Sequence, residues 1–350
     1  MKYGAATLHE IYAQPEVWRR CLQLLDKIDL EKLVGGREPH THEWLFVGCG
    51  TSYYLAQAAA ATFTILGSTP ARAVPASEVL LFPKLVFPVE GAAIFPVLIS
   101  RSGNTSEILR VAEFLRLNDI EFLIITCDGN ALAPLSARTL IVPASEKSTV
   151  MTSSFTSMLM ALQYISAKLA KRDDFVDGLH LLPDALSGLL EVYGPAVKRF
   201  AQQTFDDVAF LAQGALYPIA SETALKITES SSSYSQFFPT LEFRHGPKSI
   251  VSERVLVGAL LSETGYAEES AVLLEMKELG AQTLVIANQL TPEVRDSADL
   301  AIELALPVPE LARLVVYVVW GQLLGSYLGL HKGLNPDSPR HLTRVVTLAG

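Results

Sequence analysis

Two short polar segments carry hydroxyl side chains that could bind an anion. Residues 48–52 read GCGTS and residues 100–107 read SRSGNTSE, and each lies between an apolar run and a helical pattern. A glycine turn that opens into a helix presents backbone N–H groups to an anion. Neither G-x-G-x-x-G nor a P-loop lysine is present, so the two segments together predict a phosphate monoester site. Either one alone is also typical of a plain turn and helix cap. Their hydroxyl donors are Ser52, Ser100, Ser102 and Thr105.

The second half of the chain carries the ionisable groups. Glu222, Lys226 and Glu229 fall on one face of a predicted helix that follows a glycine turn, near the ligand edge of a sheet. On a surface helix the same spacing would give only solvated ion pairs. His245 lies beside a Gly-Pro pair in a loop, where a lone histidine is usually polar surface. A third polar stretch, residues 145–159, either contributes to a site or caps a helix.

Short apolar strands alternate with helical segments, which indicates an α/β fold built on parallel sheets. The pattern occurs twice: segments starting at residues 46, 98, 122 and 136 match segments 164, 162, 161 and 161 positions later. We therefore expect two copies of one domain, residues 1–185 and 186–350, joined by a helical connector. The second copy has Leu216 where the first has Ser52, so only the first copy is expected to bind phosphate.

Composition narrows the function further. The chain has 350 residues, a net charge of −9 and no dense Lys/Arg run, which argues against nucleic acid as a partner. Three widely spaced cysteines and a charged N-terminus favour a cytoplasmic protein without a disulfide framework. The apolar segment 311–330 contains Arg313 and Gln322, so we expect a buried helix at a domain or subunit interface, with surface for a dimer contact, and no membrane span.

Four motifs together resemble the SIS (sugar isomerase) family: FVGCGTSYYLAQ, ISRSGNTSE, ALKITESSS and LEFRHGPKS. The resemblance runs from about residue 35 to the end. It is strongest to the tandem-SIS isomerase half of glutamine–fructose-6-phosphate aminotransferase and to stand-alone deaminases, ketose/aldose isomerases and deglycases. It implies two tandem SIS domains, each a doubly wound, flavodoxin-like parallel sheet flanked by helices. The resemblance is to the isomerase half alone, so we expect no glutaminase domain before it, which favours the stand-alone activities.

The resemblance also implies roles for individual residues. Lys226 and Glu229 match the family's catalytic helix, and His245 matches a histidine that reaches the sugar of a neighbouring subunit, so a homodimer with shared active sites is expected. Arg344 aligns with a family lysine, and this difference puts a Schiff-base role at that position in doubt. The arginine would instead bind oxyanions. The substrate-binding residues expected besides Arg344 are Gly50, Thr51, Ser52, Ser100, Arg101, Ser102, Gly103, Thr105 and Thr149.

These residues suit proton transfer between carbon 1 and carbon 2 of an open-chain hexose phosphate. Glu229 would be the base, Lys226 would stabilise the developing oxyanion, and His245 would assist ring opening, with no metal or organic cofactor. We expect a phosphosugar isomerase, specifically an amino-sugar-6-phosphate deaminase/isomerase. The alternatives are a fructosamine-6-phosphate deglycase and a non-catalytic sugar-phosphate-binding regulator. The presence of both Glu229 and His245 favours an enzyme.

Overall fold

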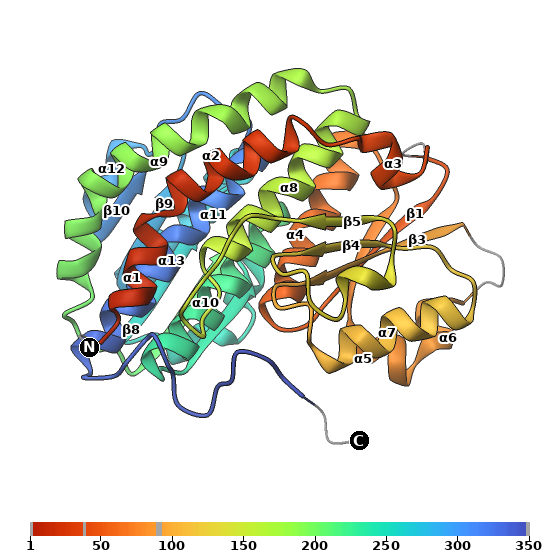
Figure 1. Ribbon diagram of the computed structural model, residues 1–350. Coiled ribbons are helices and arrows are strands. Elements are labelled where there is room, and N and C mark those ends of the chain that lie inside the picture. Colours follow the sequence, from red (N-terminus) through yellow and green to blue (C-terminus); the bar gives the residue numbers. More distant parts are fainter. Residues whose placement is uncertain (1–2, 38–39, 89–92, 348–350) are drawn as a thin grey trace. The chain divides into compact units, whose positions relative to one another are not determined.

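The computed structural model describes residues 3–37, 40–88 and 93–347 (Figure 1). The chain forms two compact units. The first-copy unit comprises Glu16–Glu146, Ser153–His180 and Thr343–Gly350; the second-copy unit comprises Met1–Pro15, Lys147–Thr152 and Leu181–Leu342. The two units interleave along the chain. Segments near both ends and one internal loop therefore belong to a different unit from the residues next to them in the sequence.

The first-copy unit is built on a five-stranded, fully parallel sheet with the order β2-β1-β3-β4-β5. Apolar side chains of β1, β3 and β4 are almost fully buried, as expected for strands covered on both faces. The strands are β1 (Glu43–Gly48), β2 (Ala71–Pro75), β3 (Ile94–Ser100), β4 (Leu123–Thr126) and β5 (Thr139–Ile141). The helices between or after them are α4 (Thr51–Gly67), α5 (Ala76–Leu81), α6 (Pro83–Val86), α7 (Ser106–Leu117) and α8 (Ser153–Leu169).

The second-copy unit repeats this topology, with the order β10-β9-β8-β6-β7 in a second parallel sheet. Gly50 after β1 and Gly214 after β6 have φ angles of 54° and 55°, so a glycine with a positive φ angle follows the first strand of each copy. The two-copy α/β prediction is confirmed. The strands are β6 (Asp207–Ala212), β7 (Ser235–Pro239), β8 (Val255–Leu260), β9 (Gln282–Ala287) and β10 (Leu300–Glu303); the helices are α10 (Tyr217–Ser231), α11 (Tyr266–Glu278), α12 (Pro292–Ser297) and α13 (Glu310–His331).

Four further helices lie outside the two sheet repeats among the described residues. They are α1 (Ala5–Tyr12), α2 (Gln14–Leu25), α3 (Leu30–Val34) and α9 (Asp173–Phe200), the last of which is the predicted helical connector. Helix α1 belongs to the second-copy unit, where Thr7 donates from its backbone N–H and its hydroxyl to Asp337, both at 2.8 Å. The start of the chain is thus tied to the segment that follows α13.

Helix α13 is the core helix of the second-copy unit. Among the described residues it is the one helix long and apolar enough to span a membrane, but 94% of that apolar window is buried. All residues from Leu311 to Ser326 are buried. The expectation of a buried helix is confirmed, whereas the expectation that it offers surface for a dimer contact is wrong, because the chain itself already covers these residues.

Glycines let α13 approach α10 unusually closely. Gly321, Gly325 and Gly329 recur every four residues, and a Cβ on Gly325 would lie 2.7 Å from the carbonyl oxygen of Lys226. A Cβ on Gly329 would lie 2.1 Å from the carbonyl oxygen of Ser230. No larger side chain fits at these positions unless the helices move apart. The glycine face of α13 therefore sets the position of α10, the helix that carries Lys226.

Candidate functional site

The loop after β3 brings three of the predicted hydroxyl groups into one hydrogen-bonded turn. Ser100 Oγ lies 3.2 Å from Thr105 Oγ1, and the N–H of Asn104 donates to Ser102 Oγ at 3.2 Å. The carbonyl oxygen of Gly103 accepts from the N–H of Leu132 at 2.9 Å, which fixes the loop against the segment after β4. The turn lies at the carboxyl end of a parallel strand, where such sheets bind ligands.

The glycine turn after β1 has the other predicted hydroxyl groups. Thr51 and Ser52 begin α4 and are almost completely buried, with 6% and 5% of their surfaces exposed, while Gly50 supplies the positive φ angle before them. Burial raises the pKa of the neighbouring Cys49 thiol to about 11, so this thiol stays protonated at neutral pH. The turn therefore offers backbone and hydroxyl donors, and no thiolate nucleophile.

Arg101 lies in the loop after β3 but is 93% buried, in an ion pair with Glu146 (Nη1 to Oε2, 3.3 Å). Its Nη2 also donates to the carbonyl oxygen of Arg344 at 3.0 Å. The same tail is held at Val346, whose carbonyl oxygen accepts from the N–H of Ser106 at 3.3 Å. Within the first-copy unit the C-terminal tail thus lies against the predicted phosphate loop, and the side chain of Arg344 is exposed there.

Glu146 also explains the polar stretch before α8. Its carboxylate accepts from the N–H and hydroxyl of Ser154 at 2.8 and 2.7 Å, and from the hydroxyl of Ser153 at 3.1 Å. The helix start is therefore capped by a buried glutamate seven residues upstream, with the serines as donors. The cap was one of the two alternatives that the sequence left open, but the sequence offered no signal for Glu146 as the capping group.

The charged face of α10 is buried. Glu222, Lys226 and Glu229 have side-chain exposures of 0%, 1% and 18%, which rules out the alternative of a solvated ion-pair face. Lys226 Nζ lies 3.3 Å from Glu222 Oε1 and donates a short hydrogen bond to Glu229 Oε2. Burial by itself would lower the pKa of Lys226, but the two carboxylates outweigh it and raise that pKa. The lysine is therefore a fixed, buried cation whose second carboxylate partner is partly accessible.

Glu222 is a member of this array to which the sequence assigned no role beyond its place on the helix face. The spacing showed that it could meet Lys226, but not that its side chain would be completely buried. Because a buried ammonium group without a carboxylate is costly, Glu222 stabilises the charged form of Lys226. Glu222 thus fixes the ammonium group beside Glu229.

His245 lies between two short 3-10 turns, Leu241–Arg244 and Pro247–Ile250, and is exposed. Its two flanks are anchored to α11: Arg244 Nε donates to Glu275 Oε2 at 2.6 Å, and Lys248 Nζ donates to Glu275 Oε1 at 2.9 Å. Hydrogen bonds from Lys248 and Arg244 lower the pKa of Glu275. The loop is thus fixed, yet the His245 ring makes no hydrogen bond to any residue that the structure describes, including Glu229.

Thr149 lies in the second-copy unit although it precedes the second sequence repeat. Its N–H donates to the carbonyl oxygen of Asp337 at 3.0 Å. The preceding residues are held by Glu10 of α1, whose carboxylate accepts from the N–H groups of Lys147 and Ser148 at 2.5 and 3.2 Å. A loop from between the repeats therefore joins the unit that carries Glu229.

Comparison with known families matches two regions of the chain, residues 40–167 and 205–319, to the model of the SIS domain. The chain belongs to the SIS domain family. The first SIS region contains both hydroxyl-rich turns, and the second contains Lys226, Glu229 and His245. Arg344 lies beyond both regions.

Individual relatives of this SIS protein are named as an aminotransferase, a deaminase and an isomerase. Over 99% of its length it is 30% identical to glutamine–fructose-6-phosphate aminotransferase (isomerizing) of Chlamydia pneumoniae, of which the alignment covers 59%. The chain thus spans about three fifths of the length of the curated relatives it matches. Glucosamine-6-phosphate deaminase of Thermotoga maritima superposes with a TM-score of 0.80 at 26% identity, covering 98% of this chain and 100% of that one.

A further solved structure, the tagatose-6-phosphate ketose/aldose isomerase of Escherichia coli, has a TM-score of 0.83 at 21% identity and covers 95% of each chain. At this identity the likeness shows the shared SIS fold alone. The tandem-SIS architecture is therefore common to proteins named for an amino transfer, a deamination and an isomerisation.

Proposed function

We propose that this SIS protein is a phosphosugar isomerase, and specifically an amino-sugar-6-phosphate deaminase/isomerase. The observation that carries the proposal is the buried array of Glu222, Lys226 and Glu229 on α10. Burying an ammonium group between two carboxylates costs desolvation energy that sugar binding by itself does not require. Catalysis does require a positioned base beside a fixed cation.

Glu229 is the residue of this array suited to proton transfer. Its side chain is 18% exposed, whereas Lys226 and Glu222 are closed off. In the proposed reaction Glu229 removes the proton from carbon 2 of the open-chain amino sugar and returns it to carbon 1. Lys226 stays protonated because its pKa is raised, and it stabilises the oxyanion that forms in the transition state. Water then hydrolyses the resulting ketimine and releases ammonia and the ketose phosphate.

Phosphate recognition is assigned to the first copy. Its support is the convergence of Ser100, Ser102 and Thr105 in one turn at the carboxyl end of β3. Gly50, Thr51 and Ser52 would add donors from the turn after β1, and Gly103 would let the backbone approach the ligand. Arg101 holds the tail through the Arg344 carbonyl group, so we assign it a positioning role and leave the exposed Arg344 side chain to bind an oxyanion. Thr149 is retained as a sugar contact.

A homodimer with shared sites remains part of the proposal. His245 is exposed on a fixed loop, and its ring has no hydrogen-bond partner among the described residues. This is the arrangement expected of a histidine that acts on a substrate bound to a second copy, where it would exchange the ring-opening proton. The proposed localisation is the cytoplasm.

The test is a panel of hexosamine, ketose and fructosamine 6-phosphates, assayed for ketose formation and for release of ammonia or of an amine. Deamination of an amino-sugar phosphate supports the proposal. Release of an amino acid from a fructosamine phosphate would make the chain a deglycase, and tight binding without turnover would make it a regulator. Glu229→Gln should lower turnover by about 10² to 10⁴ while binding survives. The matched control is Glu278→Gln at an exposed position of α11.

A further inference from the structure

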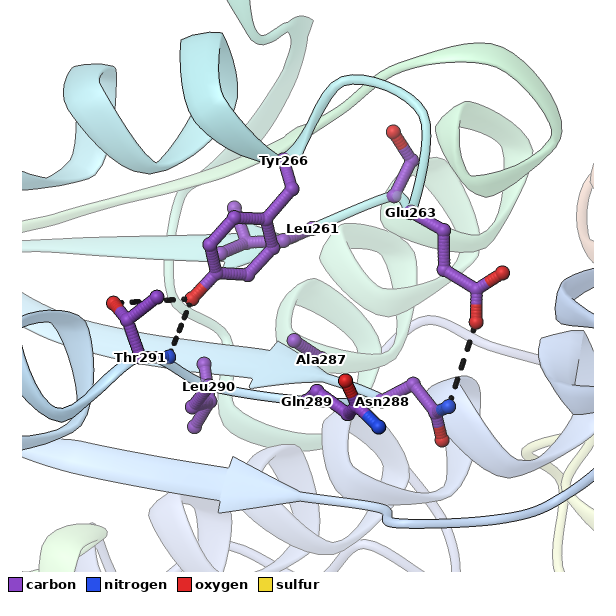
Figure 2. Close-up of a pocket in the computed structure, with 9 residues that line it drawn as sticks. Leu261, Glu263, Tyr266, Ala287, Asn288, Gln289, Leu290 and Thr291 are labelled. Carbon is purple, nitrogen blue, oxygen red and sulfur yellow. Dashed lines mark hydrogen bonds between the residues drawn. The ribbon is translucent and has the colours of Figure 1, made fainter.

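A cavity of about 420 Å³ opens at the carboxyl ends of β8 and β9 in the second-copy unit (Figure 2). Its volume is in the range of small-molecule sites, roughly 300–1,000 Å³. The cavity occupies the place in the second copy that the hydroxyl-rich loop after β3 occupies in the first, because Ser262 is the repeat equivalent of Ser100. Parallel sheets bind ligands at this edge, so the second copy has a candidate site of its own.

The chemistry of this second loop is opposite to that of the first. Glu263 stands where the first copy has Arg101, and Ala267 stands where it has Thr105. The N–H and hydroxyl of Ser262 donate to Glu269 at 2.7 and 2.8 Å, and the N–H of Glu263 donates to Glu310 at 2.5 Å. Thr264 keeps the hydroxyl of Ser102. The donors of Ser262 and Glu263, however, already bind carboxylates of the chain itself, which disfavours an anion at this loop.

The charges around the cavity favour a cation. Glu263 Oε1 accepts from the almost fully buried Arg313 and from Asn288 Nδ2, the latter at 3.4 Å, while its side chain remains 56% exposed. Its other oxygen, Oε2, accepts no hydrogen bond from the described part of the chain. Two further carboxyl groups, Glu269 and Glu310, lie behind the loop, and burial raises the pKa of both. A protonated amine would pair with Glu263 Oε2, the oxygen that accepts no hydrogen bond from the described residues.

The remaining walls suit a hydroxyl-bearing ring. Tyr266 lies on the side of the cavity away from the Glu263 carboxylate (Figure 2), and its hydroxyl accepts from the N–H of Thr291 at 2.9 Å, which holds the ring in place. Leu261 and Ala287 supply apolar lining. The exposed amide of Gln289 and that of Asn288 provide polar groups at the rim. We infer that this cavity binds an unphosphorylated amino sugar, with its ammonium group on Glu263 and its ring against Tyr266.

The inference is tested by calorimetric titration of the full chain with glucosamine and, as its uncharged counterpart, glucose, at a pH where the amine is protonated. Glucosamine should bind at least tenfold more tightly than glucose. Glu263→Gln keeps an acceptor for Arg313 but removes the charge, and it should weaken glucosamine binding at least tenfold. Glu268→Gln is the matched control, because Glu268 is exposed in the first turn of α11, the helix that follows the loop of Glu263, and does not line the cavity. It should leave the affinity unchanged.

A second variant tests the cavity without replacing Glu263, so that a fold defect in Glu263→Gln cannot explain the result. Gln289→Trp fills the mouth of the cavity from an exposed position and should also abolish binding, with an unchanged thermal midpoint. The double variant Ser102→Ala with Thr105→Ala separates this site from the phosphate loop and should still bind glucosamine. Loss of binding in that double variant, displacement of glucosamine by inorganic phosphate, or unchanged binding in Glu263→Gln would overturn the inference, as would no measurable binding of glucosamine at millimolar concentration.

Discussion

Replacing Gly325 of α13 by alanine should displace the helix that carries the proposed base. The new Cβ would lie 2.7 Å from the carbonyl oxygen of Lys226 and 3.2 Å from the Cα of Ile227. Ordinary contact begins near 3.4 Å, so α10 must move by about 0.7 Å, because backbone atoms cannot rotate out of the way. Overpacking of this kind costs about 1–3 kcal/mol, and the better helix propensity of alanine returns at most about 1 kcal/mol.

We therefore expect Gly325→Ala to lower the free energy of unfolding by about 1–2 kcal/mol. A shift approaching 1 Å at a catalytic group costs up to about 10² in rate, so turnover should fall at least tenfold. Both effects would come from a residue that contacts no substrate.

Gly188→Ala in α9 is the matched control. Gly188 is exposed, and a Cβ there would meet nothing within 4 Å. This variant should gain roughly 0.5–1 kcal/mol and keep full activity. Urea denaturation and steady-state kinetics on the best substrate of the panel measure the two quantities. If Gly325→Ala is as stable and as active as Gly188→Ala, the glycine face of α13 does not set the position of α10, and the reasoning fails.

Three further predictions concern recognition, assembly and the histidine loop. The double change Ser102→Ala with Thr105→Ala removes two donors to a charged group, each worth roughly 1.5–3 kcal/mol. Sugar-phosphate affinity should therefore fall at least tenfold, without loss of fold. An unchanged dissociation constant would place the phosphate elsewhere. Inactive Glu229→Gln and His245→Asn chains that are mixed and refolded should regain at most about half of the parental activity per mixed dimer. The reason is that one shared site of a mixed dimer receives both defects and the other receives neither. Mixed dimers that are confirmed by mass but stay inactive would remove the shared-site proposal. Glu275→Gln frees the two cations that flank the histidine and should reduce turnover severalfold at neutral pH. Because the pKa of Glu275 is lowered in the folded chain, this carboxylate should stabilise the fold above the ordinary glutamate pKa, and the stabilisation should be lost as pH falls through the lowered value. Identical acid-unfolding profiles of the parent and the variant would contradict this.

Local patterns predicted the repeated α/β fold because they depend on neighbours in sequence. Buried parallel strands require continuous apolar runs, and the turns after them require glycine at a positive φ angle, as at Gly50 and Gly214. The helical spacing likewise placed Lys226 and Glu229 on one face of α10. These features were visible in the residues before any contact between distant segments was known.

The partners that fix those residues were not visible, because each lies far away along the chain. Glu275 anchors both flanks of His245 from about thirty residues away, and Glu10 holds the loop before Thr149 from nearly 140 residues away. Nothing in the sequence near these glutamates marks them, since a single acidic residue on a helix is usually solvated. The sequence also suggested that α13 was available to a partner, whereas its residues from Leu311 to Ser326 are buried by the chain itself.

The sequence by itself determined the two-copy parallel fold and which residue types lie at the ends of its strands, because hydrophobic periodicity and turn chemistry are local properties. Only the tertiary structure decided that Lys226 is a buried cation between two carboxylates, that the tail of Arg344 lies against the loop of Arg101, and that the second loop has its donors bound to its own glutamates. Whether a charged group is buried and paired depends on which segments, far apart in the sequence, pack against each other. The free energy of that packing is a sum over many such long-range contacts, which a local sequence pattern does not contain.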